Sequence, residues 1–157
     1  MDKMESMPDR AFMLGALFIA ANRVETQLER EFQRYGITVK QWFLAIVLVH
    51  LFPAPPTISE TARVMGSSHQ NIKQLALALN RKGLLDFLKD EQDSRMIRLR
   101  LSEQGAALRE KVRSGGNAFQ TRLFNGIGDE ELKAARSVLS KILLNIDEIE
   151  NTIVEGK

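Results

Sequence analysis

Residues 57–105 read TISETARVMGSSHQNIKQLALALNRKGLLDFLKDEQDSRMIRLRLSEQG, and this stretch decides the fold. Its first half predicts two helices joined by a very short turn. Thr57 and Glu60 have the spacing of a capping box, so a short helix is expected to begin at Thr57 and to end near Met65, before Gly66. A connection this short sets two helices at a steep angle, which is the helix-turn-helix arrangement.

The second helix of this pair is expected to begin at Ser67 or Ser68 and to end at Gly83. Its buried stripe is predicted to consist of Ile72, Leu75, Ala76 and Leu79. Its first turns are polar, and amide, ammonium and hydroxyl groups at a helix N-terminus can contact base edges and phosphates in a major groove. The candidate DNA-binding residues here are Ser67, Ser68, His69, Gln70, Asn71, Lys73 and Gln74. The plainer interpretation of the same pattern is a capped surface helix with a polar face.

A change of period after Gly83 predicts two short strands around the polar tip KDEQDSR, residues 89–95. If Ile97 and Leu99 face the core, Arg98 faces outward, and Arg95 sits at the tip, where it can reach a minor groove. We therefore predict Arg95 and Arg98 as DNA contacts. The acidic residues of the tip would repel phosphate, or they would pair with some arginines and leave another free. These acids are Asp90, Glu91 and Asp93.

The segments before and after this lobe carry apolar residues at helical spacing, which predicts long helices. The expected fold is mainly α with a small β-hairpin wing (α+β), in a single domain over residues 1–157. A winged helix-turn-helix lobe at about 38–101 is flanked by N- and C-terminal dimerisation helices at about 9–35 and 102–155. Three features of the sequence are unusual for this expected fold. They are the proline-rich PAPP at 53–56, the mildly basic lobe, and Gly115-Gly116, where a kink or a break is expected in a helix interior.

Composition excludes several kinds of site. There is no cysteine, so disulfides, thiolate metal sites and cysteine nucleophiles are absent, and a reducing, cytoplasmic setting is expected. His50 and His69 are the only histidines, and neither a metal nor another cofactor is expected. No glycine-rich phosphate loop or nucleophile elbow indicates an enzyme. The apolar run 11–21 follows a net acidic stretch, so it is interpreted as an amphipathic helix and not as a signal peptide or a membrane span.

The chain resembles the MarR family of bacterial transcriptional regulators over nearly its whole length. The resemblance lies in ITVKQWFLAIVLV (37–49), in residues 57–85 and, most specifically, in DSRMIRLRLSEQG (93–105). It implies a sequence-specific regulator of double-stranded DNA, a repressor, acting as a homodimer on a pseudo-palindromic operator. Recognition helices would enter successive major grooves and wings the flanking minor grooves. Arg95 matches the wing-tip arginine of the family, and Asp93 matches the acid that orients the wing.

The resemblance also implies control by a small molecule, because many members release DNA when a phenolic compound binds between the dimer helices and the DNA-binding lobe. The aromatic content of the first two helices is consistent with a small aromatic effector. The candidate pocket residues are Phe12, Phe18, Trp42, Phe43 and His50, although core packing can account for each of them singly. The alternative function is a winged-helix adaptor that binds another protein and lacks specific DNA binding.

Overall fold

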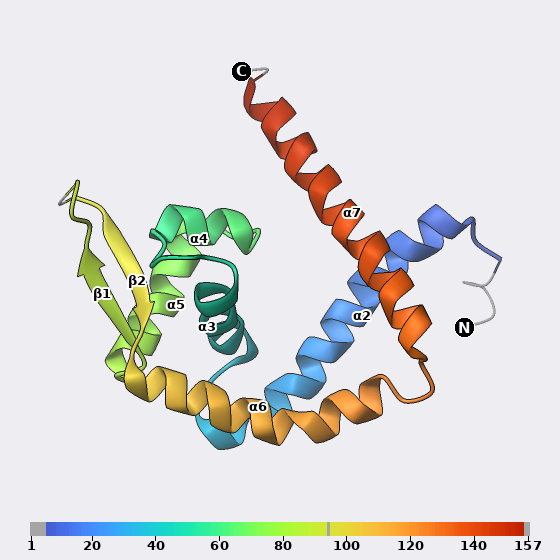
Figure 1. Ribbon diagram of the computed structural model, residues 1–157, viewed down its shortest axis with the longest axis horizontal. Helices are drawn as coiled ribbons and strands as arrows, with labels where there is room; N and C mark the ends of the chain where they lie inside the picture. The colour runs from blue at the N-terminus through green and yellow to red at the C-terminus, as the bar shows by residue number, and fades with distance from the viewer. Residues whose placement is uncertain (1–5, 94, 156–157) are drawn as a thin grey trace. The chain divides into compact units, whose positions relative to one another are not determined.

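The computed structural model describes residues 6–93 and 95–155, and it confirms the mainly helical fold with one small β-hairpin (Figure 1). The hairpin strands pair antiparallel, with Phe87 opposite Leu99. The elements in chain order are α2 (Asp9–Phe32), a 3₁₀ turn η1 (Gln33–Tyr35), α3 (Val39–His50), α4 (Ile58–Val64), α5 (His69–Arg81), β1 (Leu85–Lys89), β2 (Ile97–Leu101), α6 (Glu103–Leu123) and α7 (Asp129–Glu155).

The chain divides into two compact units, Met1–Gly116 and Asn117–Lys157, and the boundary falls inside α6. The expectation of a single domain therefore stays a prediction. The expected break at Gly115-Gly116 is wrong, because α6 is helical from Glu103 to Leu123. Each interior glycine costs a helix about 1 kcal/mol, and the rest of a 21-residue helix tolerates that cost. A kink at this place stays a prediction.

Three helices begin at side-chain caps. Thr38 caps α3 and Thr57 caps α4, both in full capping boxes, and the box at Thr57 is the predicted one. Ser68, not Ser67, caps α5, since its hydroxyl accepts the Asn71 N–H at 3.1 Å. Gly66 and Gly83, the glycines predicted to stop the two helices of the pair, have positive φ, which agrees with that role. Gly36, at the end of η1, also has positive φ.

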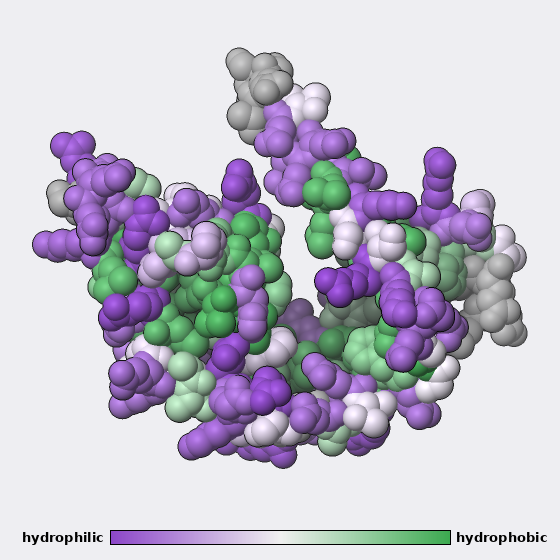
Figure 2. Space-filling model, in the orientation of Figure 1, coloured by the Kyte–Doolittle hydropathy of each residue, from purple (hydrophilic) through white to green (hydrophobic). Residues whose placement is uncertain are grey.

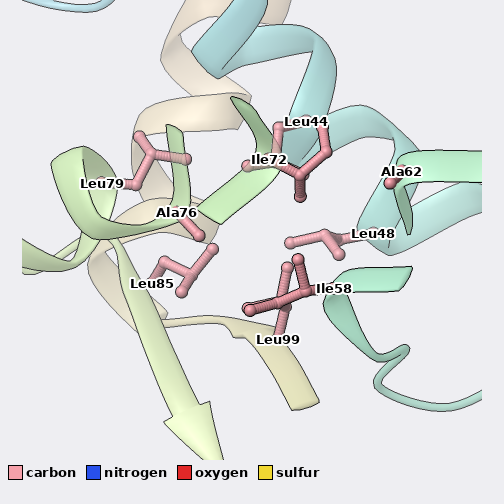
Figure 3. Packing of buried hydrophobic residues seen from close by; sticks show 9 residues of the cluster. All are labelled: Leu44, Leu48, Ile58, Ala62, Ile72, Ala76, Leu79, Leu85 and Leu99. Atoms are coloured by element: carbon pink, nitrogen blue, oxygen red, sulfur yellow. The ribbon is translucent and has the colours of Figure 1, made fainter. Parts of the chain in front are cut away.

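The core of the lobe is one cluster to which α3, α4, α5 and both strands contribute (Figure 3). Leu44, Ile72 and Leu99 have no exposed surface, and burying a side chain of this size contributes about 1.5–3 kcal/mol each. The residues of the cluster are Leu44, Leu48, Ile58, Ala62, Ile72, Ala76, Leu79, Leu85 and Leu99. The helix pair and the hairpin are therefore held on one common core.

A second cluster joins the end of α2 to α3 and to the first half of α6. Phe32 is 3% exposed, and its ring lies 5.2 Å from the Trp42 ring in a tilted arrangement. A carboxylate oxygen of Glu29 accepts the Val39 N–H at 2.8 Å, which holds the start of α3 on α2. Val112 of α6 is buried in the same cluster. The start of α3 is thus fixed to α2 by both packing and a hydrogen bond.

Gly105 explains why the wing motif ends in a glycine. A Cβ atom placed there would lie 2.1 Å from the carbonyl oxygen of Leu84, a contact that no side chain can make. The hydroxyl of Ser102 accepts the Gly105 N–H at 3.0 Å and donates to the Gly83 carbonyl at 2.7 Å. Together these contacts set α6 directly against the chain that enters β1.

Candidate nucleic-acid interface

The turn between α4 and α5 is short and hydrogen-bonded to α4. The Ser67 N–H donates to the Ala62 carbonyl at 2.9 Å, and the Gly66 N–H donates to the Arg63 carbonyl at 3.1 Å. Gly66 itself has φ 56°, which an L side chain adopts only with strain. These contacts join α4 to α5 through a short, hydrogen-bonded turn, which agrees with the helix-turn-helix prediction.

The recognition-helix candidate α5 has one buried and one exposed face. Its stripe Ile72, Ala76 and Leu79 is buried, and Leu75 beside it is half-buried. Of the predicted contact residues Ser67 is half-buried, and the six others are exposed, namely Ser68, His69, Gln70, Asn71, Lys73 and Gln74. Packing of the apolar stripe therefore turns the polar face away from the core.

Several polar groups on that face have no partner within the part of the chain that the structure describes. The side chains of His69, Gln70, Lys73 and Gln74 make no hydrogen bond or ion pair there, whereas Asn71 Nδ2 donates to the Ser67 hydroxyl at 2.8 Å. The N–H groups of a first helical turn have no acceptor within the helix, and only that of Asn71 is capped by a side chain. This end of α5 can therefore donate hydrogen bonds to an anion or to base edges.

The hairpin is attached to the lobe by backbone hydrogen bonds. The Leu99 N–H donates to the Pro56 carbonyl at 2.8 Å, and Thr57 forms an antiparallel bridge with Arg98. Asn80 Nδ2 of α5 donates to the Leu85 carbonyl at 2.6 Å. The wing is thus tied to the segment before α4 and to the recognition-helix candidate.

Asp90 organises the turn at the wing tip. One of its carboxylate oxygens accepts the N–H groups of Gln92 and Asp93, each at 2.9 Å, and the other accepts Nε–H of Arg98. These contacts lower the pKa of Asp90, the Asp93 N–H being the largest cause, followed by Arg98. Sequence reasoning did not single out Asp90 as a structural residue. An aspartate at the first position of a turn was the available signal.

Asp93, predicted to orient the wing, bonds the backbone of the tip. Its side chain accepts the Arg95 N–H at 2.9 Å, and its carbonyl accepts the Met96 N–H at 2.9 Å. Asp90 in turn donates its own N–H to the Met96 carbonyl at 3.1 Å. The two aspartates therefore fix successive parts of the same turn.

The three arginines of the hairpin have different surroundings. Arg98 is paired with Asp90 and also donates from Nη1 to the Pro55 carbonyl at 2.8 Å. Arg100 pairs with Asp86 at 3.0 Å. Arg95 is exposed, and its guanidinium has no partner among residues 6–93 and 95–155. The expectation that acids pair with some arginines and leave another free agrees with this arrangement, while a DNA contact by Arg98 stays a prediction.

Two of the five predicted pocket residues line a common cavity. Trp42 and Phe43 border a cavity of about 490 Å³ between α2, α3 and the turn before α5. Phe12 and Phe18 do not line it, since they lie nearer the start of α2 with 37% and 67% exposure. His50 does not line it either, because it lies at the far end of α3, where Arg109 Nη1 is 2.9 Å from its Nε2.

The described ranges contain neither a metal-binding cluster nor a membrane-spanning helix. No cluster of three or more His, Asp or Glu side chains there could hold a metal ion. None of the helices in those ranges combines the length and the hydropathy needed to cross a bilayer.

Comparison with known proteins places the fold among winged-helix regulators. No protein-family model matches the sequence. The chain is 26% identical over 137 residues to the HTH-type transcriptional repressor MdtR of Bacillus subtilis (strain 168), covering 87% of this chain and 84% of that protein. The S. aureus MepR–DNA complex superposes with a TM-score of 0.70 at 19% identity, over 83% of this chain and 93% of MepR.

A MarR-family transcriptional regulator from Rhodococcus sp. RHA1 gives a TM-score of 0.73 at 22% identity, over 85% of this chain and 93% of that one. These similarities confirm the resemblance at the level of the fold. They cover between 83% and 87% of this chain.

The hydrogen bonds that Thr57 donates to the Glu60 carboxylate predict that the stability of the protein depends on pH. The N–H of Thr57 donates to this carboxylate at 2.7 Å and the Thr57 hydroxyl at 2.9 Å, and these bonds lower the pKa of Glu60. Because the pKa of Glu60 is lower in the folded state than in the unfolded state, its ionised form stabilises the fold at any pH above the unfolded-state pKa. This contribution to the free energy of unfolding is lost as the pH falls through the folded-state pKa. We expect Glu60→Gln to reduce the free energy of unfolding near neutral pH and the difference from wild type to shrink on acidification.

Urea unfolding of both proteins between neutral and acidic pH measures this difference. Thr57→Val provides the control, because Glu60→Gln in that background should show a smaller pH-dependent difference. Parallel pH curves for the wild type and Glu60→Gln would contradict the assignment.

Proposed function

We propose that this chain, which has the fold of the MarR-family regulators, belongs to that family and is a DNA-binding transcriptional repressor. It would act as a homodimer on a pseudo-palindromic operator in double-stranded DNA. The observation that carries the proposal is the polar, exposed N-terminal half of α5, presented directly after a tight turn from α4. The hairpin adds one exposed arginine without a partner in the described structure, Arg95.

In this proposal the N-terminal end of α5 enters a major groove and the wing tip reaches the adjacent minor groove. Gln70, Asn71 and Gln74 carry amides that can read adenine edges, and Lys73 can contact guanine or phosphate. Between Thr57 and Gly105 there are eight Lys/Arg against six Asp/Glu, a net charge of +2. Base and minor-groove contacts therefore contribute much of the affinity, because the general attraction to phosphate is modest.

Binding to DNA is tested with duplexes selected from a random pool and with bulk DNA, at about 50 and 200 mM salt. We expect a selected duplex to bind more tightly than bulk DNA at both salt concentrations, and the affinity for each to fall as the salt concentration rises. Arg95→Ala should weaken operator binding by about 1–3 kcal/mol without unfolding the protein, because it removes a groove contact.

Arg34→Ala, which removes an exposed arginine paired with Glu31 near the end of α2, is the matched control and should keep the wild-type affinity. A selection that enriches no duplex over bulk DNA would favour the adaptor function, in which the winged helix binds another protein.

A homodimer is supported by apolar side chains on the long helices. Along α7, apolar residues repeat with the three- and four-residue spacing of a helix-packing seam. Hydrophobic residues reach the surface along this helix (Figure 2), with Ile146 44% and Ile149 59% exposed. The repeat consists of Leu132, Ala135, Leu139, Ile142, Ile146 and Ile149, and continues to Ile153, whose side chain lies outside the described residues. A second copy is the proposed cover for this surface.

Sedimentation velocity at micromolar concentration tests the dimer. We expect a mass twice the 17.7 kDa of one chain. Ile149→Glu should shift the protein toward the monomer, or lower its Tm in a concentration-dependent way, because it places a charge in the seam. Asn151→Glu, a charge added to an exposed polar position of the same helix, is the control. A wild-type monomer at tens of micromolar would contradict the homodimer.

Regulation by a small aromatic acid is the remaining part of the proposal. The 490 Å³ cavity is within the size range of small-molecule sites, and it combines the rings of Trp42 and Phe43 with the ammonium of Lys40. Its wall also includes Gly66 and Asn71, at the turn that leads into α5. A ligand there would contact the recognition helix directly, so that its binding and DNA binding can be coupled.

Thermal-shift screening with benzoic and phenolic acids tests this coupling. An effector should raise the Tm and weaken operator binding, and Phe43→Ala should reduce both effects because it removes one wall of the cavity. Phe18→Ala, a similar change outside the cavity, should leave both unchanged. Uniformly flat melting temperatures would indicate a regulator that does not respond to these compounds.

A further inference from the structure

The proline-rich segment before α4 and the wing meet at Arg98. Pro55 and Pro56 both accept hydrogen bonds from β2, at 2.8 Å from Arg98 Nη1 and 2.8 Å from the Leu99 N–H. Proline has a fixed φ and no N–H of its own, so this segment offers a stiff row of carbonyl oxygens. Pro55 and Pro56, the second half of the PAPP sequence, thus form a stiff edge to which the wing is hydrogen-bonded.

From Arg98 the contacts continue to the tip of the wing. Its Nε–H pairs with Asp90, whose side chain is only 7% exposed, and the other oxygen of Asp90 holds the Gln92 and Asp93 N–H groups. Asp93 in turn accepts the Arg95 N–H. A continuous path of hydrogen bonds therefore leads from the Pro55 carbonyl through Arg98, Asp90 and Asp93 to the backbone of Arg95.

We propose that Arg98 and Asp90 are positioning residues that clamp the wing onto the Pro55-Pro56 edge and thereby present Arg95 to the minor groove. In this role the Arg98 guanidinium acts inside the protein and does not contact DNA. The presentation of Arg95 to the minor groove rests on the proposed DNA-binding function, whereas the clamp itself can be measured without DNA. The lowered pKa of Asp90 agrees with a carboxylate that stays charged in this pair.

The geometry favours this role over a phosphate contact. Two of the donor groups of Arg98 are already bonded to protein acceptors, and its side chain is 36% exposed, compared with 55% for Arg100 in the neighbouring pair. A phosphate contact would compete with the Asp90 carboxylate for the same charge. Arg95, by contrast, has no such competitor among the residues described.

The first test measures amide hydrogen exchange at the wing tip in the full-length protein without DNA. Arg98→Ala and Asp90→Asn should both increase exchange at Gln92, Asp93 and Met96, while α5 stays protected. Arg98→Lys should restore part of the protection, because an ammonium can keep one of the two contacts. Asp86→Asn, which breaks the neighbouring pair that does not reach Pro55, is the control and should leave the tip unchanged. Unchanged protection in Arg98→Ala and Asp90→Asn would overturn the clamp.

The second test is a double-mutant cycle on operator affinity. Arg98→Ala alone should weaken binding about as much as Arg95→Ala, roughly five- to 150-fold, and the double variant should be little weaker than Arg95→Ala. The slope of log affinity against log salt should be the same for Arg95→Ala and for the double variant, since Arg98 touches no phosphate.

Additive losses, with a further decrease of the salt slope in the double variant, would instead make Arg98 a direct contact and overturn the proposal. If the wild type selects no duplex, the proposed function fails, and hydrogen exchange alone then decides whether the clamp exists.

Discussion

The packing of the apolar stripe of α5 on the lobe core is the constraint on which the rest of this structure depends. Ile72, Ala76 and Leu79 are almost completely buried, so the helix cannot rotate about its axis without exposing them. Because successive residues of a helix are about 100° apart, the burial of this stripe also decides which residues face outward. The polar first turns of α5 are therefore directed to solvent by hydrophobic packing, and the Gly66 turn fixes where along the lobe that face begins.

The same core fixes the wing relative to α5. Leu85 and Leu99, one from each strand, belong to the same buried cluster as Ile72 and Ala76, so the hairpin and the helix share one core. Hydrogen bonds at the edges add direction to this packing: β2 bonds to the Pro56 carbonyl, and Asn80 of α5 bonds to the start of β1. A ligand that spans both elements would meet two surfaces held rigidly by one core.

Local patterns in the sequence were sufficient for the helix pair and the hairpin. Capping boxes, stop glycines and the switch from helical to alternating period involve residues only a few positions apart, and such signals can be read directly. The contacts between distant segments could not be read in this way. Arg98 was expected to face a ligand because it alternates with buried residues. Its guanidinium turns back to the Pro55 carbonyl, which lies 43 positions earlier in the chain. Likewise, aromatic composition suggested one pocket, but of its five predicted residues Trp42 and Phe43 line the 490 Å³ cavity, whereas Phe12 and Phe18 lie nearer the start of α2.

The distribution of charge in the wing resolves an apparent conflict between a nearly neutral lobe and the proposed binding to DNA. Asp90 and Asp86 neutralise arginines that the hairpin uses internally, so those acids do not simply oppose DNA. Of the hairpin cations, Lys89 and Arg95 have no ion pair among the described residues, and in the proposed complex Arg95 lies at the tip, where it can reach the negative potential of a narrow minor groove. Such a lobe has a modest general attraction to phosphate and depends more on groups in defined positions, such as Arg95 and the exposed face of α5. Discrimination between a specific site and bulk DNA then increases, because the sequence-independent part of the binding free energy is small.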